Sequence, residues 1–166
     1  MKKVLITGGA GFIGYHLANK LLESNYQIDL LDNYSRGVSD LHINNLAKND
    51  KINLFKIDLL DSSCIDQLNN EYAYIYHLAA LIGVKHVIKS PYDVLKKNFI
   101  LLQNALDVAK RQRRLERFVF TSTSEVYAGT LNQFGLEFPT PERTPLTINN
   151  MYESRTSYML SKIYGE

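Results

Sequence analysis

What this sequence lacks already excludes two kinds of protein. Its 166 residues hold one cysteine, Cys64, which rules out an intrachain disulfide and is typical of a reducing compartment. No apolar stretch approaches the roughly 20 residues of a membrane-spanning helix. A glycine-rich segment interrupts the first apolar run, and no small-residue cleavage site follows, which argues against a signal peptide. We therefore expect a cytoplasmic protein with no membrane partner and an inert thiol.

The sequence also lacks a large excess of positive or negative charge. The 19 basic and 17 acidic residues give a net charge of +2, so no overall attraction to nucleic acid is expected. A basic cluster at 110–114 is better explained as a solvated helix end, because no aromatic residues are interleaved with it. Hydrophobic content of 45% and charged content of 22% indicate an ordinary globular protein, and the length predicts one domain. We predict no metal site.

A glycine-rich segment near the start of the chain is its most informative feature. The apolar run at 4–6 predicts a strand buried on both faces. Gly8, Gly11 and Gly14 follow it, and a helical pattern begins at once. The apolar positions that share one face of that helix are Ile13, Leu17, Leu21 and Leu22. Such a strand–turn–helix is either a phosphate-binding turn or an ordinary tight turn.

An acidic residue favours the phosphate-binding interpretation. Gly8 permits a tight turn, Gly11 lets the backbone approach a pyrophosphate, and Gly14 lets the helix pack closely. The helix N-terminus offers free N–H groups to the anion. Asp32 ends the next apolar run, 18 residues after Gly14, where a carboxylate binds the ribose hydroxyls. A carboxylate there predicts NAD rather than NADP, although Arg36 lies close enough to weaken that preference.

The order of the remaining elements predicts the fold. Strands are expected at 3–7, 27–31, 52–57, 73–77 and 118–120, separated by helices near 12–24, 61–70 and 91–113. Residues 33–50 are expected to form a loop with a short helix, and residues 128–150 a polar loop that holds three of the four prolines. Alternating strands and helices with short connections predict an α/β fold with a doubly wound parallel sheet, Rossmann-like.

The residues that follow the third and fourth strands belong on the ligand side of such a sheet. Asp58 and Leu59 end the third, and Asp58 either meets an adenine or caps a helix, a role for which Asp61 and Ser62 compete. After the fourth comes His77-Leu78-Ala79-Ala80, whose small residues leave room for a ribose against the backbone. We interpret the His77 side chain as structural.

One polar residue interrupts the apolar face of the long helix at 91–113. Asn98 needs a hydrogen-bond partner at that position. We expect its role to be structural, tying the helix to the active-site backbone.

Hydroxyl groups crowd the end of the fifth strand. Residues 121–127 read Thr-Ser-Thr-Ser-Glu-Val-Tyr and serve either a ligand or helix caps and turns. Further on, Tyr158 and Lys162 are four residues apart, which places them on one face of a helix. A cation beside a phenol predicts a lowered tyrosine pKa. Such a tyrosine is suited to act as a general base on a sugar hydroxyl.

Together the glycine segment, the His-Leu-Ala-Ala run, the hydroxyl-rich strand end and the Tyr158–Lys162 pair resemble the extended short-chain dehydrogenase/reductases, the nucleotide-sugar epimerases and dehydratases. The resemblance implies that Tyr158 is the catalytic base, that Lys162 lowers its pKa and binds the nicotinamide ribose, and that Thr123 binds the reacting hydroxyl. The NAD-binding residues that it implies are Gly8, Gly11, Phe12, Ile13, Gly14, Asp32, Asn33, Arg36, Asp58, Leu59, Leu78, Ala79, Ala80, Tyr158 and Lys162.

The two residues after Thr123 differ between subfamilies of these enzymes. Dehydratases of the dTDP-glucose type usually have Thr-Asp-Glu, whereas this chain has Thr123-Ser124-Glu125. The triplet is more similar to that of UDP-glucuronate decarboxylases, and GDP-mannose dehydratases have a similar one. The resemblance implies oxidation at sugar C4 to a 4-keto intermediate, a nucleotide-sugar substrate with UDP favoured, and Glu125 as an acid/base near C5.

Two further expectations concern the chain as a whole. It stops four residues after Lys162, so we interpret residues 1–166 as the NAD-binding Rossmann domain without the substrate-binding lobe of family members. We expect this part to bind NAD but not to turn over sugar nucleotide, and the resemblance implies a homodimer. The alternative is a non-catalytic dinucleotide-binding module, which would have no need of Thr123, Tyr158 and Lys162.

Overall fold

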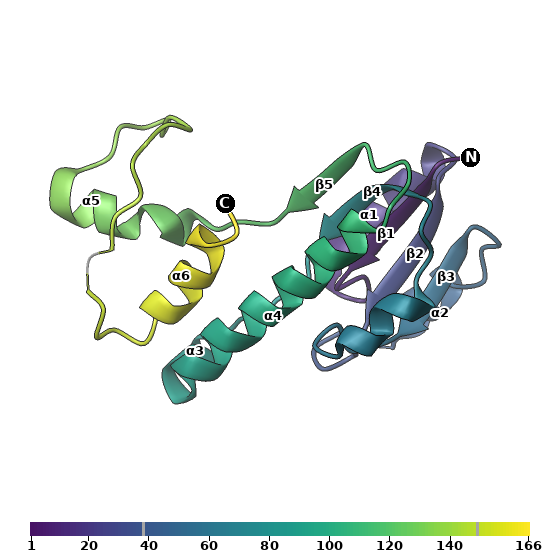
Figure 1. Cartoon of the computed structure of the whole chain (residues 1–166), viewed down its shortest axis with the longest axis horizontal. Helices are drawn as coiled ribbons and strands as arrows, with labels where there is room; N and C mark the ends of the chain where they lie inside the picture. Colours follow the sequence, from purple (N-terminus) through teal and green to yellow (C-terminus); the bar gives the residue numbers. More distant parts are fainter. Residues whose placement is uncertain (38, 149) are drawn as a thin grey trace. The chain divides into compact units, whose positions relative to one another are not determined.

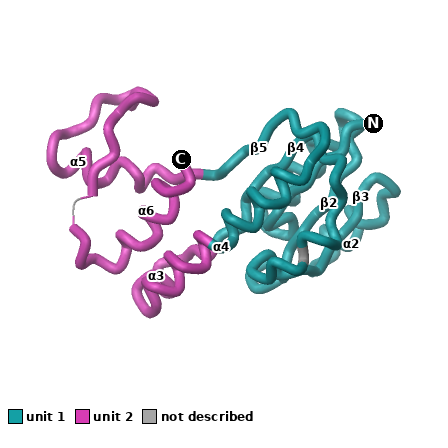
Figure 2. The backbone as a smooth tube through the Cα atoms, viewed as in Figure 1, with its two compact units in different colours: residues 1–80, 100–121 teal, residues 81–99, 122–166 magenta. Residues whose placement is uncertain are grey.

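A computed structural model describes residues 1–37, 39–148 and 150–166; the side chain of Cys64, and with it the predicted inert thiol, lies outside the description. The chain divides into two compact units (Figure 2). Unit 1 comprises residues 1–80 and 100–121, and unit 2 comprises residues 81–99 and 122–166. This division concerns packing alone, so the expectation of one Rossmann domain stays a prediction.

Unit 1 contains a five-stranded parallel sheet in the order β3-β2-β1-β4-β5 (Figure 1). The strands are β1 (Lys3–Thr7), β2 (Gln27–Asp32), β3 (Ile52–Lys56), β4 (Tyr72–His77) and β5 (Arg117–Phe120). The α/β class and the doubly wound parallel sheet predicted from the sequence are confirmed. Strands β2 and β3 are added on one side of β1, and β4 and β5 on its other side. The carboxyl ends of β1 and β4 therefore mark the switch point where ligands bind in such folds.

Both faces of the sheet are buried, which explains its continuous apolar strands. On one face, Val4 and Ile6 of β1 join a core with Ala18 of α1 (Phe12–Glu23) and Leu46 of α2 (Leu41–Leu46). On the other face, Leu5 joins a core with residues of η1 (Ser62–Gln67) and of α4 (Pro91–Lys110). Alternate side chains of each strand thus serve opposite cores.

The helices of unit 1 follow the predictions with two differences. The helix expected at 61–70 is a short 3-10 helix, η1, with Asp61 as its N-cap: the Asp61 carboxylate accepts the Ser63 N–H at 2.9 Å. Ile13 is 62% exposed, so its assignment to the apolar face of α1 is wrong. The first turn of α1 stands at the carboxyl edge of the sheet, while Leu17 and Leu21 further along reach the core.

Unit 2 is helical. It contains α3 (Val84–Lys89), the beginning of α4, η2 (Ser124–Tyr127), α5 (Ala128–Phe134) and α6 (Thr156–Ile163). The sequence pattern did not predict α3. The loop expected from residue 128 is wrong at its start, because Ala128–Phe134 form α5. A long-range contact fastens α5, since the Thr130 hydroxyl donates to the Pro145 carbonyl at 2.5 Å. Among the described residues, no helix is both long and apolar enough to cross a membrane.

Candidate active site

The glycine turn of unit 1 is closed by backbone contacts. Gly8 has φ +70°, and its N–H donates to the Leu31 carbonyl at 2.8 Å. A Cβ at Gly8 would stand 2.9 Å from the Ala79 nitrogen, at the ends of β1 and β4. A Cβ at Gly14 would stand 2.6 Å from the Gly8 oxygen and 2.7 Å from the Gly9 Cα. Real Cβ atoms do not approach backbone so closely, so the turn needs glycine at both positions.

We expect Gly14→Ala to weaken NAD⁺ binding by about 10- to 100-fold. The new methyl group would push the Gly8–Gly9 backbone, and overpacking of this kind costs about 1–3 kcal/mol, with 1.4 kcal/mol per tenfold in affinity. Isothermal titration of the purified chain with NAD⁺ measures the effect. Lys20→Ala, an exposed change on the same helix, is the control. Unchanged affinity of the Gly14 variant would contradict the assignment of this turn to the cofactor.

Asp32 lies beside the turn and is nearly buried, with 8% exposure. Its carboxylate accepts the Ala10 N–H at 3.0 Å and the Tyr34 N–H at 2.8 Å. A Cβ at Gly37 would stand 3.1 Å from Asp32 Oδ1, so the loop after β2 folds tightly over this carboxylate. The acid is therefore held next to the glycine turn, and a cradle that any side chain would fill fits the phosphates and ribose of a dinucleotide.

Three other predicted cofactor residues, which follow β1 and β2 in the chain, lie at the surface. Phe12 is 80% exposed at the start of α1. Asn33 and Arg36 are exposed in the loop after β2, where the Asn33 side chain accepts the Ser35 N–H at 2.9 Å.

The ends of β3 and β4 are fastened by hydrogen bonds. The Asp58 carboxylate accepts the Leu60 N–H at 2.9 Å; since Asp61 caps η1, the helix-cap alternative for Asp58 is excluded. Leu59 is a core residue whose carbonyl accepts from Asn104 at 2.7 Å.

The His-Leu-Ala-Ala run is joined to the end of β1. His77 is 2% exposed, and its Nδ1 is hydrogen-bonded to the Thr7 hydroxyl at 2.8 Å, which confirms its structural role. The N–H groups of Leu78 and Ala79 donate to the carbonyl and hydroxyl oxygens of Thr7 at 3.1 and 3.2 Å. Ala80 follows, partly exposed.

Unit 2 brings the four predicted catalytic residues together. Tyr158 and Lys162 lie in α6, as the spacing predicted, and the Lys162 Nζ is 5.8 Å from the centroid of the Tyr158 ring. Thr123 caps η2, and its side chain lies close enough to Tyr158 to lower the pKa of the phenol. Glu125 of η2 is close enough to act electrostatically on the phenol. A phenol, a hydroxyl, an ammonium group and a carboxylate together are suited to proton transfer.

The predicted lowering of the Tyr158 pKa is wrong for the chain by itself. Burial of the phenol, and then the Glu125 carboxylate, raise the pKa of Tyr158, and the smaller opposing effect of the Thr123 side chain does not offset them. The helical spacing revealed the lysine but neither the burial nor the carboxylate from a distant segment.

Burial acts on Lys162 as well. It lowers the pKa of Lys162 from 10.5 to about 8. The unfolded chain therefore binds more protons than the folded chain between pH 8 and 10.5, and stability contributed by this group rises with pH across that window.

We expect the free energy of unfolding of wild type, relative to Lys162→Met, to increase from pH 8 to pH 10.5. Urea unfolding at several pH values measures this, with the exposed Lys89→Met as control. A pH-independent difference would contradict it.

Asn98 has the structural role that the sequence suggested. Its side chain accepts the Leu81 N–H at 2.7 Å and donates to the Leu81 carbonyl at 3.1 Å. It also donates to the Ser161 hydroxyl at 3.2 Å, and that hydroxyl donates to the Tyr158 carbonyl at 2.7 Å. Ser161, which the sequence analysis missed, therefore links α4 to the helix that carries the tyrosine.

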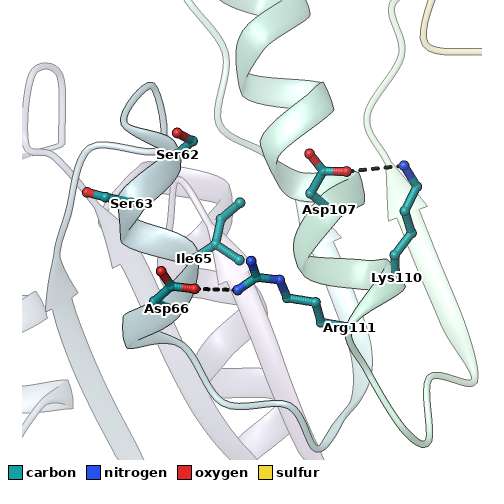
Figure 3. Close-up of a pocket in the computed structure, with 7 residues that line it drawn as sticks. All are labelled: Ser62, Ser63, Ile65, Asp66, Asp107, Lys110 and Arg111. Carbon is teal, nitrogen blue, oxygen red and sulfur yellow. Dashed lines mark hydrogen bonds and ion pairs between the residues drawn. The ribbon is translucent and has the colours of Figure 1, made fainter.

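A surface cavity of about 570 Å³ lies in unit 1 between η1 and the end of α4 (Figure 3). Ion pairs cross and border it: Arg111 contacts Asp66 at 2.6 Å, and Lys110 contacts Asp107 at 3.1 Å. The cavity contains none of the predicted cofactor-binding residues. Its cations belong to the basic cluster at 110–114, in which Lys110, Arg111 and Arg113 pair with carboxylates.

The parallel sheet and the glycine turn at its switch point define a Rossmann-like α/β protein. Residues 4–166 match the NAD dependent epimerase/dehydratase family, and the chain belongs to that family.

Relatives of known name support this membership. The chain is 37% identical over 126 residues to a UDP-N-acetyl-alpha-D-glucosaminuronate decarboxylase of Bacillus cytotoxicus, a match that covers 76% of this chain and 38% of the relative. It is 31% identical to a UDP-glucose 4-epimerase of Schizosaccharomyces pombe, covering 92% of this chain and 46% of the relative. The structure of the UDP-Glc/GlcNAc 4-epimerase of Campylobacter jejuni superimposes with a TM-score of 0.81 at 28% identity, covering 99% of this chain and 47% of that one. The chain thus spans less than half the length of these three proteins.

Proposed function

We propose that this chain supplies the NAD-binding and acid–base part of a nucleotide-sugar modifying enzyme that oxidises sugar C4 to a 4-keto intermediate. The observation that carries the proposal is the grouping of Thr123, Glu125, Tyr158 and Lys162 in unit 2, which a module that only binds a dinucleotide has no need of. Membership of the epimerase/dehydratase family supports it.

In this proposal the turn of unit 1 holds the cofactor. The N–H groups at the start of α1 face the phosphates, and Asp32 accepts from the ribose hydroxyls while its bonds to Ala10 and Tyr34 keep it in place. When bound, NAD⁺ supplies an acceptor for the hydride that leaves C4. The family description supports NAD, and a 2′-phosphate would be repelled by Asp32.

The residues of unit 2 handle the proton. Tyr158 accepts the proton of the C4 hydroxyl, and Thr123 hydrogen-bonds to the same hydroxyl. Lys162 supplies positive charge beside the phenol at neutral pH, because its pKa of about 8 keeps most of it protonated there. That charge opposes the raised pKa of Tyr158 and favours the phenolate.

A UDP-sugar is the substrate we propose, and Glu125 is proposed as a second acid/base near C5. Two relatives, a UDP-sugar decarboxylase and a UDP-glucose 4-epimerase, support the nucleotide by their names. The Thr123-Ser124-Glu125 triplet supports a decarboxylase-like chemistry at C5 over a dTDP-glucose dehydratase.

Two measurements test the proposal. Titration of the chain with NAD⁺ and NADP⁺ should give tighter binding of NAD⁺. A chimera, in which residues 1–166 replace the matching part of the C. jejuni epimerase, should then oxidise a UDP-sugar. Quenching with sodium borodeuteride traps the 4-keto intermediate as deuterium at C4, which mass spectrometry detects. A chimera that binds NAD⁺ yet incorporates no deuterium from UDP-glucose, UDP-N-acetylglucosamine or UDP-glucuronate would support a binding module instead.

A further inference from the structure

An ion pair joins the two segments of unit 2 that carry the proposed catalytic groups. The Arg155 Nη2 lies 2.9 Å from Glu125 Oε1, where it donates a hydrogen bond. Glu125 belongs to η2, two residues after Thr123, and Arg155 is the residue that precedes α6 and its Tyr158. The contact therefore spans 30 residues and joins Glu125 of the acid–base group to a residue three positions before Tyr158.

Stability is a poor explanation for this pair. The side chain of Arg155 is 63% exposed and that of Glu125 is 36% exposed. Exposed pairs contribute little to folding, because solvent screens the charges and two long side chains lose freedom. A charge-assisted hydrogen bond does, however, restrict where a carboxylate sits. Its position matters here, because the Glu125 carboxylate raises the pKa of Tyr158.

We propose that Arg155 is a positioning residue that acts through Glu125, holding this carboxylate beside Tyr158 and compensating its charge. This inference deepens the proposed function and rests on it for the role of the tyrosine. Arg155 needs no contact with substrate or cofactor in this role.

The charged groups around the phenol predict effects of opposite sign. Glu125 from η2 disfavours the phenolate. The Lys162 ammonium from α6, which lies 5.8 Å from the centroid of the Tyr158 ring, should favour it. Removing Arg155 leaves the Glu125 charge uncompensated, so the pKa of Tyr158 should rise further. Removing the Glu125 charge should lower the pKa of Tyr158. If Arg155 acts only through Glu125, its loss should have no further effect once Glu125 is neutral.

The experiment is a double-mutant cycle read by NMR on the 166-residue chain. Tyrosine labelled with ¹³C at Cζ reports ionisation of the phenol, and Tyr158→Phe assigns the resonance. We expect the Tyr158 titration to move up in pH for Arg155→Gln, down for Glu125→Gln, and to coincide with that of Glu125→Gln in the double variant. Arg155→Lys, which keeps the charge and a donor, should restore most of the wild-type position.

Controls separate positioning from a general charge effect. Arg143→Gln removes the same charge at an exposed site of unit 2 and should leave the Tyr158 titration unchanged. An unchanged titration for Arg155→Gln, or an equal rise in the presence and absence of Glu125, would overturn the proposal. Because this readout needs neither NAD nor substrate, its failure is distinguishable from failure of the proposed function, which appears as a chimera without turnover.

Discussion

Replacing Tyr158 by phenylalanine is expected to slow sugar oxidation by the chimera about 10²- to 10⁴-fold, the range that general acid–base groups contribute. The change removes one oxygen atom and keeps the half-buried ring against Lys162. Binding of NAD⁺ should change little, because the variant keeps the Tyr158 ring and leaves the glycine turn and Asp32 of unit 1 unaltered. The loss should therefore appear in kcat, measured under saturating UDP-sugar.

A matched variant tests whether the effect belongs to this phenol. Tyr152→Phe makes the same chemical change in unit 2 at a side chain that is 98% exposed, and it should keep wild-type turnover. If Tyr158→Phe also turned over at the wild-type rate, Tyr158 would not be the base. The Glu125 carboxylate would then be the next candidate for that role. Thermal unfolding of both variants checks that the fold is intact.

The second large effect concerns stability. Asp29→Ala is expected to lower the free energy of unfolding by about 3–5 kcal/mol, as the loss of one partner of a buried ion pair does. Asp29 is fully buried in β2. Its carboxylate contacts Lys3 at 3.0 Å and accepts from Tyr72 at 2.5 Å and from Asn53 at 2.8 Å. Alanine would leave these three polar groups without their acceptor.

The network extends across four neighbouring strands of the sheet, from β3 through β2 and β1 to β4, so its loss should reach the whole of unit 1. Typical domains are stable by only about 5–15 kcal/mol, which makes the expected loss a large fraction of the total. Burial and the Asp29 carboxylate both raise the pKa of Tyr72, so its phenol keeps donating at any ordinary pH. Urea unfolding followed by circular dichroism measures the change.

Asp66→Ala is the matched control for Asp29→Ala. Asp66 pairs with Arg111 at 2.6 Å, shorter than the Lys3–Asp29 contact, but its side chain is 76% exposed (Figure 3). We expect a loss of at most about 1 kcal/mol there. Equal losses for the two aspartates would contradict the view that burial, and not distance, decides the effect. Asp29→Asn, which keeps the shape of the side chain, should lie between them.

Local pattern predicted much of the fold of unit 1. Apolar runs such as 4–6 and 27–31 became strands in register, and Gly8 took the positive φ that a strand–turn–helix needs. Pattern failed where non-local contacts decide. The start of the polar segment at 128–150 forms α5, held through Thr130 by Pro145, and Ile13 matched the helical period but lies at the edge of the sheet.

The sequence by itself determined the order of the five strands, the glycine turn, the place of Asp32 at the end of β2, and the shared face of Tyr158 and Lys162. These features depend on neighbours within a few residues, where backbone geometry permits little else. Only the tertiary structure decided that Asp29 is shared by Lys3, Asn53 and Tyr72, that Arg155 holds Glu125, and that the pKa of Tyr158 is raised. Burial and the field of a distant charge depend on which segments meet in space, and sequence spacing carries no record of that.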